Sequence, residues 1–119
     1  MLKRVLLIIF LLPGLAAAAS KMHQSGIDWQ DWSAEAFEQA ERENKIILLN
    51  VGMEGCAACY RMDTITYADE DVMRLVNDHF VTIAVDSEAR PDIGERYMDW
   101  AWPATIFMAP DTTQVLAVR

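Results

Sequence analysis

Apolar residues recur at helical spacing in some stretches of the chain and form short continuous runs in others. Ser33 is a good N-cap, and the apolar residues around it predict a helix that ends at Asn44–Lys45: Trp32, Ala36, Phe37 and Ala40. The run from Ile46 to Val51 is apolar except at Asn50. Its length and β-branched content predict a strand that is buried on both faces, parallel to a neighbour and central in its sheet.

The same alternation continues to the end of the chain. Helical segments are expected at 57–65, after a cap at Asp69, and at 91–99, with strands at 81–85, 104–109 and 115–118. The helix after Asp69 is expected to have one apolar face, made of Val72, Leu75, Val76 and Phe80. A core position is the default for four methionines: Met62, Met73, Met98 and Met108. Strands that alternate with helices predict an α/β sheet with crossover helices, and the short last connection predicts a hairpin.

The first residues are expected to lie outside the fold. A positive start at residues 1–4, an apolar run at 5–15 and four alanines at 16–19 are typical of a signal peptide over residues 1–19. An uncleaved anchor is the alternative. Residues 20–32 then form an N-terminal lead, and 33–119 form one domain with no further membrane span. We expect export, to the periplasm in the first place, with secretion as the other destination.

The charge balance restricts the partners. The chain has a net charge of −8, and loss of Lys3 and Arg4 with the leader would make it more negative. Nucleic acid is therefore not expected as a partner, because phosphate contacts need clustered lysine and arginine. A weaker hypothesis is that the acidic surface selects basic partners by electrostatic steering.

Cys56 and Cys59 are expected to carry the chemistry. They form a Cys-x-x-Cys pair where the buried strand enters a helix, and the helix N-terminus favours a thiolate. This placement predicts a thiol–disulfide oxidoreductase in which Cys56 attacks and Cys59 resolves the mixed disulfide. Its partners would be protein thiols or disulfides and a protein that recycles the pair, with no cofactor. The direction of electron flow stays open.

The other uses of such a cysteine pair are a structural disulfide and a metal or interaction site. A purely structural disulfide is disfavoured because so short a loop gives little stabilisation. A metal site, or a non-enzymatic interaction or metal-chaperone module, would need further ligands. The histidines are His23, in the lead, and His79, at a helix end where a surface or capping role is expected; of the methionines, only Met53 lies close to the pair. No metal is expected.

The strand, short turn, Cys56–Cys59 pair and later Trp102–Pro103 together resemble the thioredoxin superfamily. The resemblance extends from about residue 33 to 118. Within the superfamily, the sequence most specifically resembles exported domains similar to the C-terminal domain of DsbD and spermatogenesis-associated thioredoxin-like domains. It implies a central mixed four-stranded sheet flanked by helices. It also implies that Pro103 is the family's cis-proline, packed against the cysteines, and that Trp102 borders a substrate groove, although a core position for Trp102 is an equal alternative.

This sequence departs from the thioredoxin pattern in three places. Asn50 stands where thioredoxins carry a buried acid, so the proton of Cys59 would pass to water or to Glu54. Gly55, Ala57 and Ala58 replace the usual neighbours of the cysteines. The sequence stops after the last expected strand, so the C-terminal helix is expected to be missing. Either a second copy or a partner then covers the exposed sheet face, or the sequence is a fragment or a truncated form.

Overall fold

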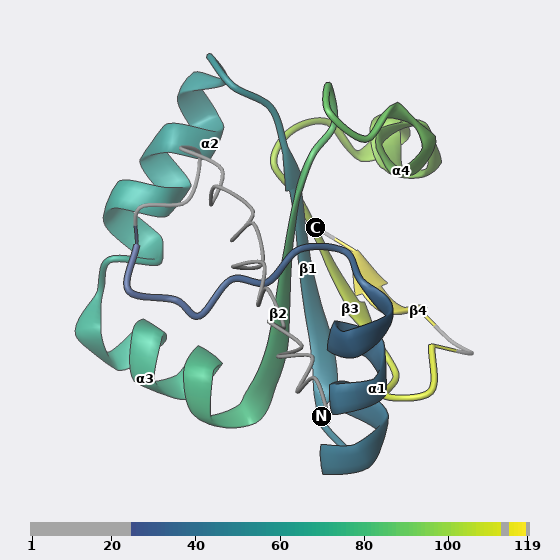
Figure 1. Cartoon of the computed structure of the whole chain (residues 1–119). Coiled ribbons are helices and arrows are strands. Elements are labelled where there is room, and N and C mark those ends of the chain that lie inside the picture. The colour runs from purple at the N-terminus through teal and green to yellow at the C-terminus, as the bar shows by residue number, and fades with distance from the viewer. Residues whose placement is uncertain (1–24, 113–114, 119) are drawn as a thin grey trace, which may run out of the picture.

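The computed structural model describes residues 25–112 and 115–118, and the predicted leader lies outside this range. Figure 1 shows one sheet with helices on both of its faces. The helices are α1 (Ala34–Glu43), α2 (Ala57–Arg61), the π-helix η1 (Met62–Thr66), α3 (Glu70–His79), α4 (Pro91–Tyr97) and the 3-10 helix η2 (Met98–Trp100). The strands are β1 (Ile46–Gly52), β2 (Phe80–Asp86), β3 (Ala104–Met108) and β4 (Val115–Val118).

The sheet has four strands in the order β2-β1-β3-β4 and is mixed, as predicted. Strand β1 pairs in parallel with β2, whereas β1–β3 and β3–β4 are antiparallel. The prediction that β1 is central is therefore confirmed. The prediction that it pairs in parallel is right for its edge with β2 and wrong for its edge with β3. In this register Asn50 lies opposite Ala84 on one side and Thr105 on the other.

Alternate residues of β1 supply two separate cores. Ile47, Leu49 and Val51 are fully buried in a cluster that includes residues of α1 and α4. Leu48 belongs to a smaller cluster with Tyr67 and others on the opposite face. Figure 1 shows the corresponding layers, with α2 and α3 on one side of the sheet and α1 and α4 on the other.

Capping residues define the two longest helices as the sequence predicts. The Ser33 side chain accepts a hydrogen bond from the Ala36 N–H at 3.3 Å, and α1 ends at Asn44 in the left-handed conformation with φ 51°. The Asp69 carboxylate accepts from the N–H groups of Asp71 and Val72 at the start of α3. Both helix starts are thus determined by local hydrogen bonds.

Three details of the pattern were predicted wrongly. Phe80 begins β2 instead of ending the apolar face of α3, and Leu75 on that helix is 56% exposed. Met98 is 61% exposed rather than in the core, since it lies on the short helix η2 beyond the end of α4. The helical segment predicted over 57–65 is confirmed: it is α-helical to Arg61 and continues as a π-helix.

The residues just before Ser33 pack onto the sheet. Gln30 bridges to Ile83: its N–H donates to the Thr82 carbonyl, and its own carbonyl accepts from the Ala84 N–H, both at 3.0 Å. Ile27 is buried, and the Trp29 ring contacts Tyr67 edge-on at 5.1 Å between centroids. Trp29 therefore has a structural role, in the smaller core cluster with Tyr67. Within the described residues no helix is both long and apolar enough to span a membrane.

Candidate functional site

The two cysteines lie where β1 passes into α2. The strand ends at Gly52, and a turn containing Gly55 at φ 81° brings the chain to Cys56, the N-cap of α2. Cys59 lies in the first turn of that helix and forms a disulfide with Cys56, with 5.2 Å between the two Cα atoms. The Cys59 N–H points at Cys56 Sγ, 3.1 Å away. A negative charge on this sulfur would accept that hydrogen bond, which favours the thiolate at Cys56.

The loop before β3 lies against the same sulfur. The Trp102–Pro103 peptide bond is cis, and the Trp102 carbonyl oxygen is 3.8 Å from Cys56 Sγ. Both residues are half-buried, and the Trp102 side chain packs against the core cluster of α1 and α4. Trp102 therefore has a core contact through its side chain while its backbone borders the disulfide, so the two alternatives for this residue are not exclusive.

The predicted supporting residues differ in their surroundings. Asn50 is 5% exposed, and its Oδ1 has no hydrogen-bond partner within residues 25–112 and 115–118. Glu54 is exposed in the turn before Cys56. An amide cannot take up a proton near neutral pH, whereas a carboxylate can. Of these two, only Glu54 could accept the proton of Cys59, and it would do so from the solvent side.

Asp63 is a buried acid that the sequence analysis did not single out. It is 6% exposed, and it follows Cys59 by one helical turn on the continuous segment of α2 and η1. Residues four apart on a helix lie on the same side, so Asp63 is below Cys59 and on the inner side of this segment. The sequence signal was present: an acid four residues after the second cysteine of a predicted helix.

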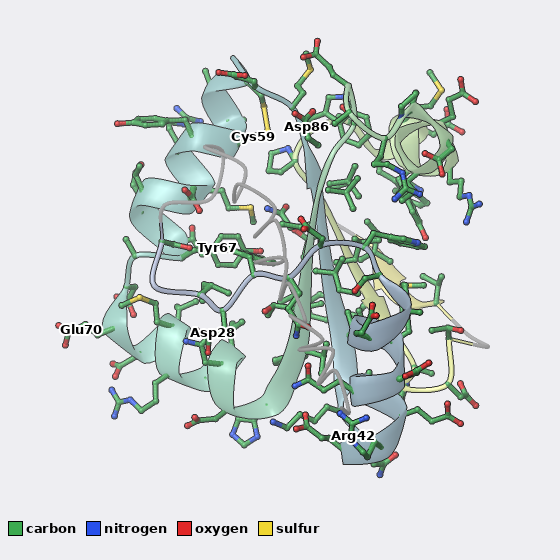
Figure 2. All side chains as sticks on the ribbon, viewed as in Figure 1. Asp28, Arg42, Cys59, Tyr67, Glu70 and Asp86 are labelled. Atoms are coloured by element: carbon green, nitrogen blue, oxygen red, sulfur yellow. A yellow bond between two sulfur atoms is a disulfide. The ribbon has the colours of Figure 1, made fainter. Side chains whose placement is uncertain are left out.

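Tyr67 extends this polar region toward the sheet. Burial raises the pKa of its phenol, the nearby Thr105 side chain opposes that rise, and the charge of Asp63 adds to it. Thr105 is the β3 residue opposite Asn50. Asn50, Thr105, Asp63 and Tyr67 are thus four buried polar side chains, and Figure 2 shows Tyr67 between the sheet and the helices that follow the cysteines.

Two hollows border the Trp102–Pro103 loop. One, of about 550 Å³, lies between the α2–η1 segment and β3, where Ala58, Ile65 and Pro103 contribute to its lining. The other, of about 220 Å³, lies beside Trp102 on the side of α4. Ile65 is largely exposed, so the first hollow has an apolar side chain at its edge.

Metal ligands do not assemble in the part of the chain that the structure describes. No group of three or more His, Cys, Asp or Glu side chains there could hold an ion. His79 is exposed in the last turn of α3, as expected, and His23 lies outside the described residues.

A mixed four-stranded sheet, helices on both faces and a Cys-x-x-Cys disulfide at a helix start define the class of this protein: it is a thioredoxin-like domain. Solved structures agree at the level of the fold. A thioredoxin from Thermus thermophilus superposes with a TM-score of 0.68 at 21% identity, covering 79% of this chain and 75% of its own. A structure described as DsbH oxidoreductase gives 0.68 at 17% identity, covering 90% and 81%.

The family is also shown. A family model named Thioredox_DsbH, described as a protein of unknown function (DUF255), matches residues 16–119, and the chain belongs to this family. Spermatogenesis-associated protein 20 of Mus musculus is 36% identical over 92 residues, and an uncharacterized protein of Caenorhabditis elegans is 39% identical over 93. Each match covers 71% of this chain but only 12% and 13% of those longer proteins. The predicted resemblance to the thioredoxin superfamily and to spermatogenesis-associated domains is confirmed.

Proposed function

We propose that this protein is an exported thiol–disulfide oxidoreductase that acts on protein substrates, with Cys56 as nucleophile and Cys59 as resolving thiol. The observation that carries the proposal is the hydrogen bond from the Cys59 N–H to Cys56 Sγ. It stabilises negative charge on one of the two sulfurs, and a thiolate is the species that attacks a disulfide. The redox fold supports the proposal, whereas substrates and export rest on the sequence.

The exchange reaction balances in two steps. In the reduced protein, the Cys56 thiolate attacks one sulfur of a substrate disulfide, which forms a mixed disulfide and releases the other substrate sulfur as a thiolate. Cys59 then loses its proton and attacks Cys56 Sγ, which closes the Cys56–Cys59 disulfide and releases the second substrate thiolate. Two electrons pass from the cysteine pair to the substrate. The reverse sequence oxidises a substrate dithiol, and in either direction a recycling partner must restore the pair.

Asp63 is our candidate for the group that takes the proton of Cys59. It is buried and one helical turn away, whereas Glu54 is exposed and lies on the turn before Cys56. A base held near the thiol on a helix needs no rearrangement to act. In this proposal Asp63 performs the task that the buried acid of thioredoxins performs from the position of Asn50.

Trp102 and Pro103 are our candidates for the edge that receives the substrate. The Trp102 carbonyl is adjacent to Cys56 Sγ, so an extended substrate segment could pair with this backbone while its own sulfur meets Cys56. We propose the periplasm as the location because of the predicted leader, although the relatives from mouse and Caenorhabditis elegans do not favour that compartment in particular.

Cysteine variants test the function directly. The reduced protein is mixed with a peptide disulfide, and release of peptide thiol is followed with time. Cys56→Ser should abolish exchange, and Cys59→Ser should accumulate a mixed disulfide of protein and peptide that is visible by mass spectrometry. The wild-type protein and Glu41→Gln, which alters an exposed side chain of α1 away from the sulfurs, serve as controls. Exchange that persists in Cys56→Ser would refute the proposal.

A further inference from the structure

A small hollow lies between α4 and Trp102, the residue whose carbonyl oxygen is beside Cys56 Sγ. It has a volume of about 220 Å³, and Glu95, Met98 and Trp102 contribute to its lining. Because the Trp102 carbonyl is 3.8 Å from Cys56 Sγ, a substrate whose sulfur reacts with Cys56 would have its neighbouring side chains close to this hollow. Figure 1 shows α2 and α4 at the same end of the sheet, on opposite faces.

The walls of the hollow combine apolar surface with one charge. Met98, in the lining, is 61% exposed. Trp100, two residues further along the chain, is 54% exposed, so apolar side chains remain uncovered on this segment. Glu95 is the only ionisable residue among those that line the hollow, which also include Ser87, Pro91 and Gly94.

The surrounding charges are mostly negative. Arg90 is held by both oxygens of Asp92, at 2.8 and 2.9 Å, which neutralises that cation locally. Arg96 follows Glu95 on α4, while Glu88 and Asp99 are exposed carboxylates on the flanking segments. With a net charge of −8 on the chain, the field at this hollow attracts cations.

We propose that this hollow binds a lysine or arginine side chain that lies next to the reacting cysteine of the substrate protein. The methylene stem would pack on Met98 and Trp102, and the cationic end would meet the Glu95 carboxylate and the indole ring. A basic side chain is the one occupant that uses both the apolar walls and the negative charge. This inference rests on the proposed function and names the substrate class for the same site.

The test uses three peptides that carry one cysteine blocked as a disulfide with 2-mercaptoethanol. The residue next to the cysteine is arginine, methionine or glutamate. The reduced protein converts each peptide to free peptide thiol and 2-mercaptoethanol, and the second-order rate constant is measured at low salt. We expect the arginine peptide to react about threefold to fivefold faster than the glutamate peptide. A rate ratio of this size corresponds to the free energy of a single exposed ion pair.

Protein variants separate the hollow from the overall charge and from the intrinsic reactivity of each peptide. Glu95→Lys should abolish or invert the ratio of the arginine and glutamate rates, and Glu95→Gln should give an intermediate ratio. Glu41→Lys makes the same change in charge at a distant position, on α1 next to Arg42. Figure 2 shows Arg42 at the opposite end of the sheet from Cys59. This variant should leave the ratio of the two rates unchanged. Equal ratios in the wild type and Glu95→Lys would overturn the inference.

A neutral small disulfide distinguishes this failure from failure of the function itself. If the reduced wild-type protein does not react even with bis(2-hydroxyethyl) disulfide, the proposed oxidoreductase function is wrong. If it reacts with that compound but the peptide ratio does not depend on Glu95, only the basic-residue pocket is wrong.

Discussion

The two faces of β1 differ in chemistry although they belong to the same seven-residue strand. On one face, Ile47, Leu49 and Val51 are fully buried among apolar residues of α1, α4 and the neighbouring strands. On the other, Leu48 is followed by the buried amide of Asn50, and Asp63 and Tyr67 lie nearby in the region below the cysteines. We conclude that stability is concentrated on the first face, whereas the second face carries the buried polar groups, among them the base proposed for Cys59.

The first prediction tests the apolar face. Leu49→Ala should lower the free energy of unfolding by about 2–5 kcal/mol, because the side chain is fully buried and its loss leaves a cavity. Urea denaturation of the oxidised protein measures the effect. Leu75→Ala is the matched control, since the same atoms are removed from an exposed position on α3, and a change within about 0.5 kcal/mol is expected there. Similar losses in both variants would show that the apolar face is not the main source of stability.

The second prediction tests the polar face through Asp63. Asp63→Asn should slow the closing of the Cys56–Cys59 disulfide from the mixed disulfide by about tenfold to a hundredfold near neutral pH, at the lower end of what a positioned base contributes. Stopped-flow mixing with a peptide disulfide separates this step from the first attack. The defect should shrink at higher pH, where the Cys59 thiol ionises without help.

Glu54→Gln provides the control for this step. It removes the exposed carboxylate that the sequence offers as the alternative base, and it should change the rate of disulfide closing by less than about twofold. A large defect in Glu54→Gln, with none in Asp63→Asn, would assign the proton transfer to the solvent side. A defect in Asp63→Asn that did not vary with pH would indicate a structural role instead.

The contrast between the faces also explains what could be read from the sequence. The α/β architecture, the caps Ser33 and Asp69 and the position of the cysteine pair depend on local patterns, and the structure shows them as predicted. Asn50 was recognisable as a polar interruption of an apolar run. The fold and the position of the cysteine pair are thus encoded over short distances along the chain.

Features that depend on packing between distant segments were not recognised. The burial of Asp63 requires the turn of η1 and the approach of β3, so a single acid in a helical pattern looked like any surface residue. Leu75 and Met98 fit an apolar pattern but lie beyond the reach of either core. Gln30 precedes the predicted domain start, yet its backbone hydrogen bonds join it to β2.

The smallest expected effect concerns Tyr67 and the pH dependence of stability. Burial raises the pKa of this phenol above its ordinary value of 10.0, so the folded state holds the proton more tightly than the unfolded state does. The resulting stabilisation is fully present below the unfolded pKa and is lost as the pH rises through the folded pKa. Above about pH 10 the free energy of unfolding should therefore fall by up to about 1.4 kcal/mol per pH unit from this group.

Tyr67→Phe should remove this part of the alkaline loss, because it keeps the ring against Trp29 and deletes the ionisable hydroxyl. Tyr60→Phe makes the same change at an exposed position on α2. Its stability should depend on pH in the same way as that of the wild type. Urea denaturation at several values between pH 8 and about pH 11 measures the difference. If the two variants had the same alkaline slope, the phenol of Tyr67 would not be protected by burial, and the polar face would be open to solvent. Asp63 would then share that solvent with Glu54, and its advantage as the base for Cys59 would disappear.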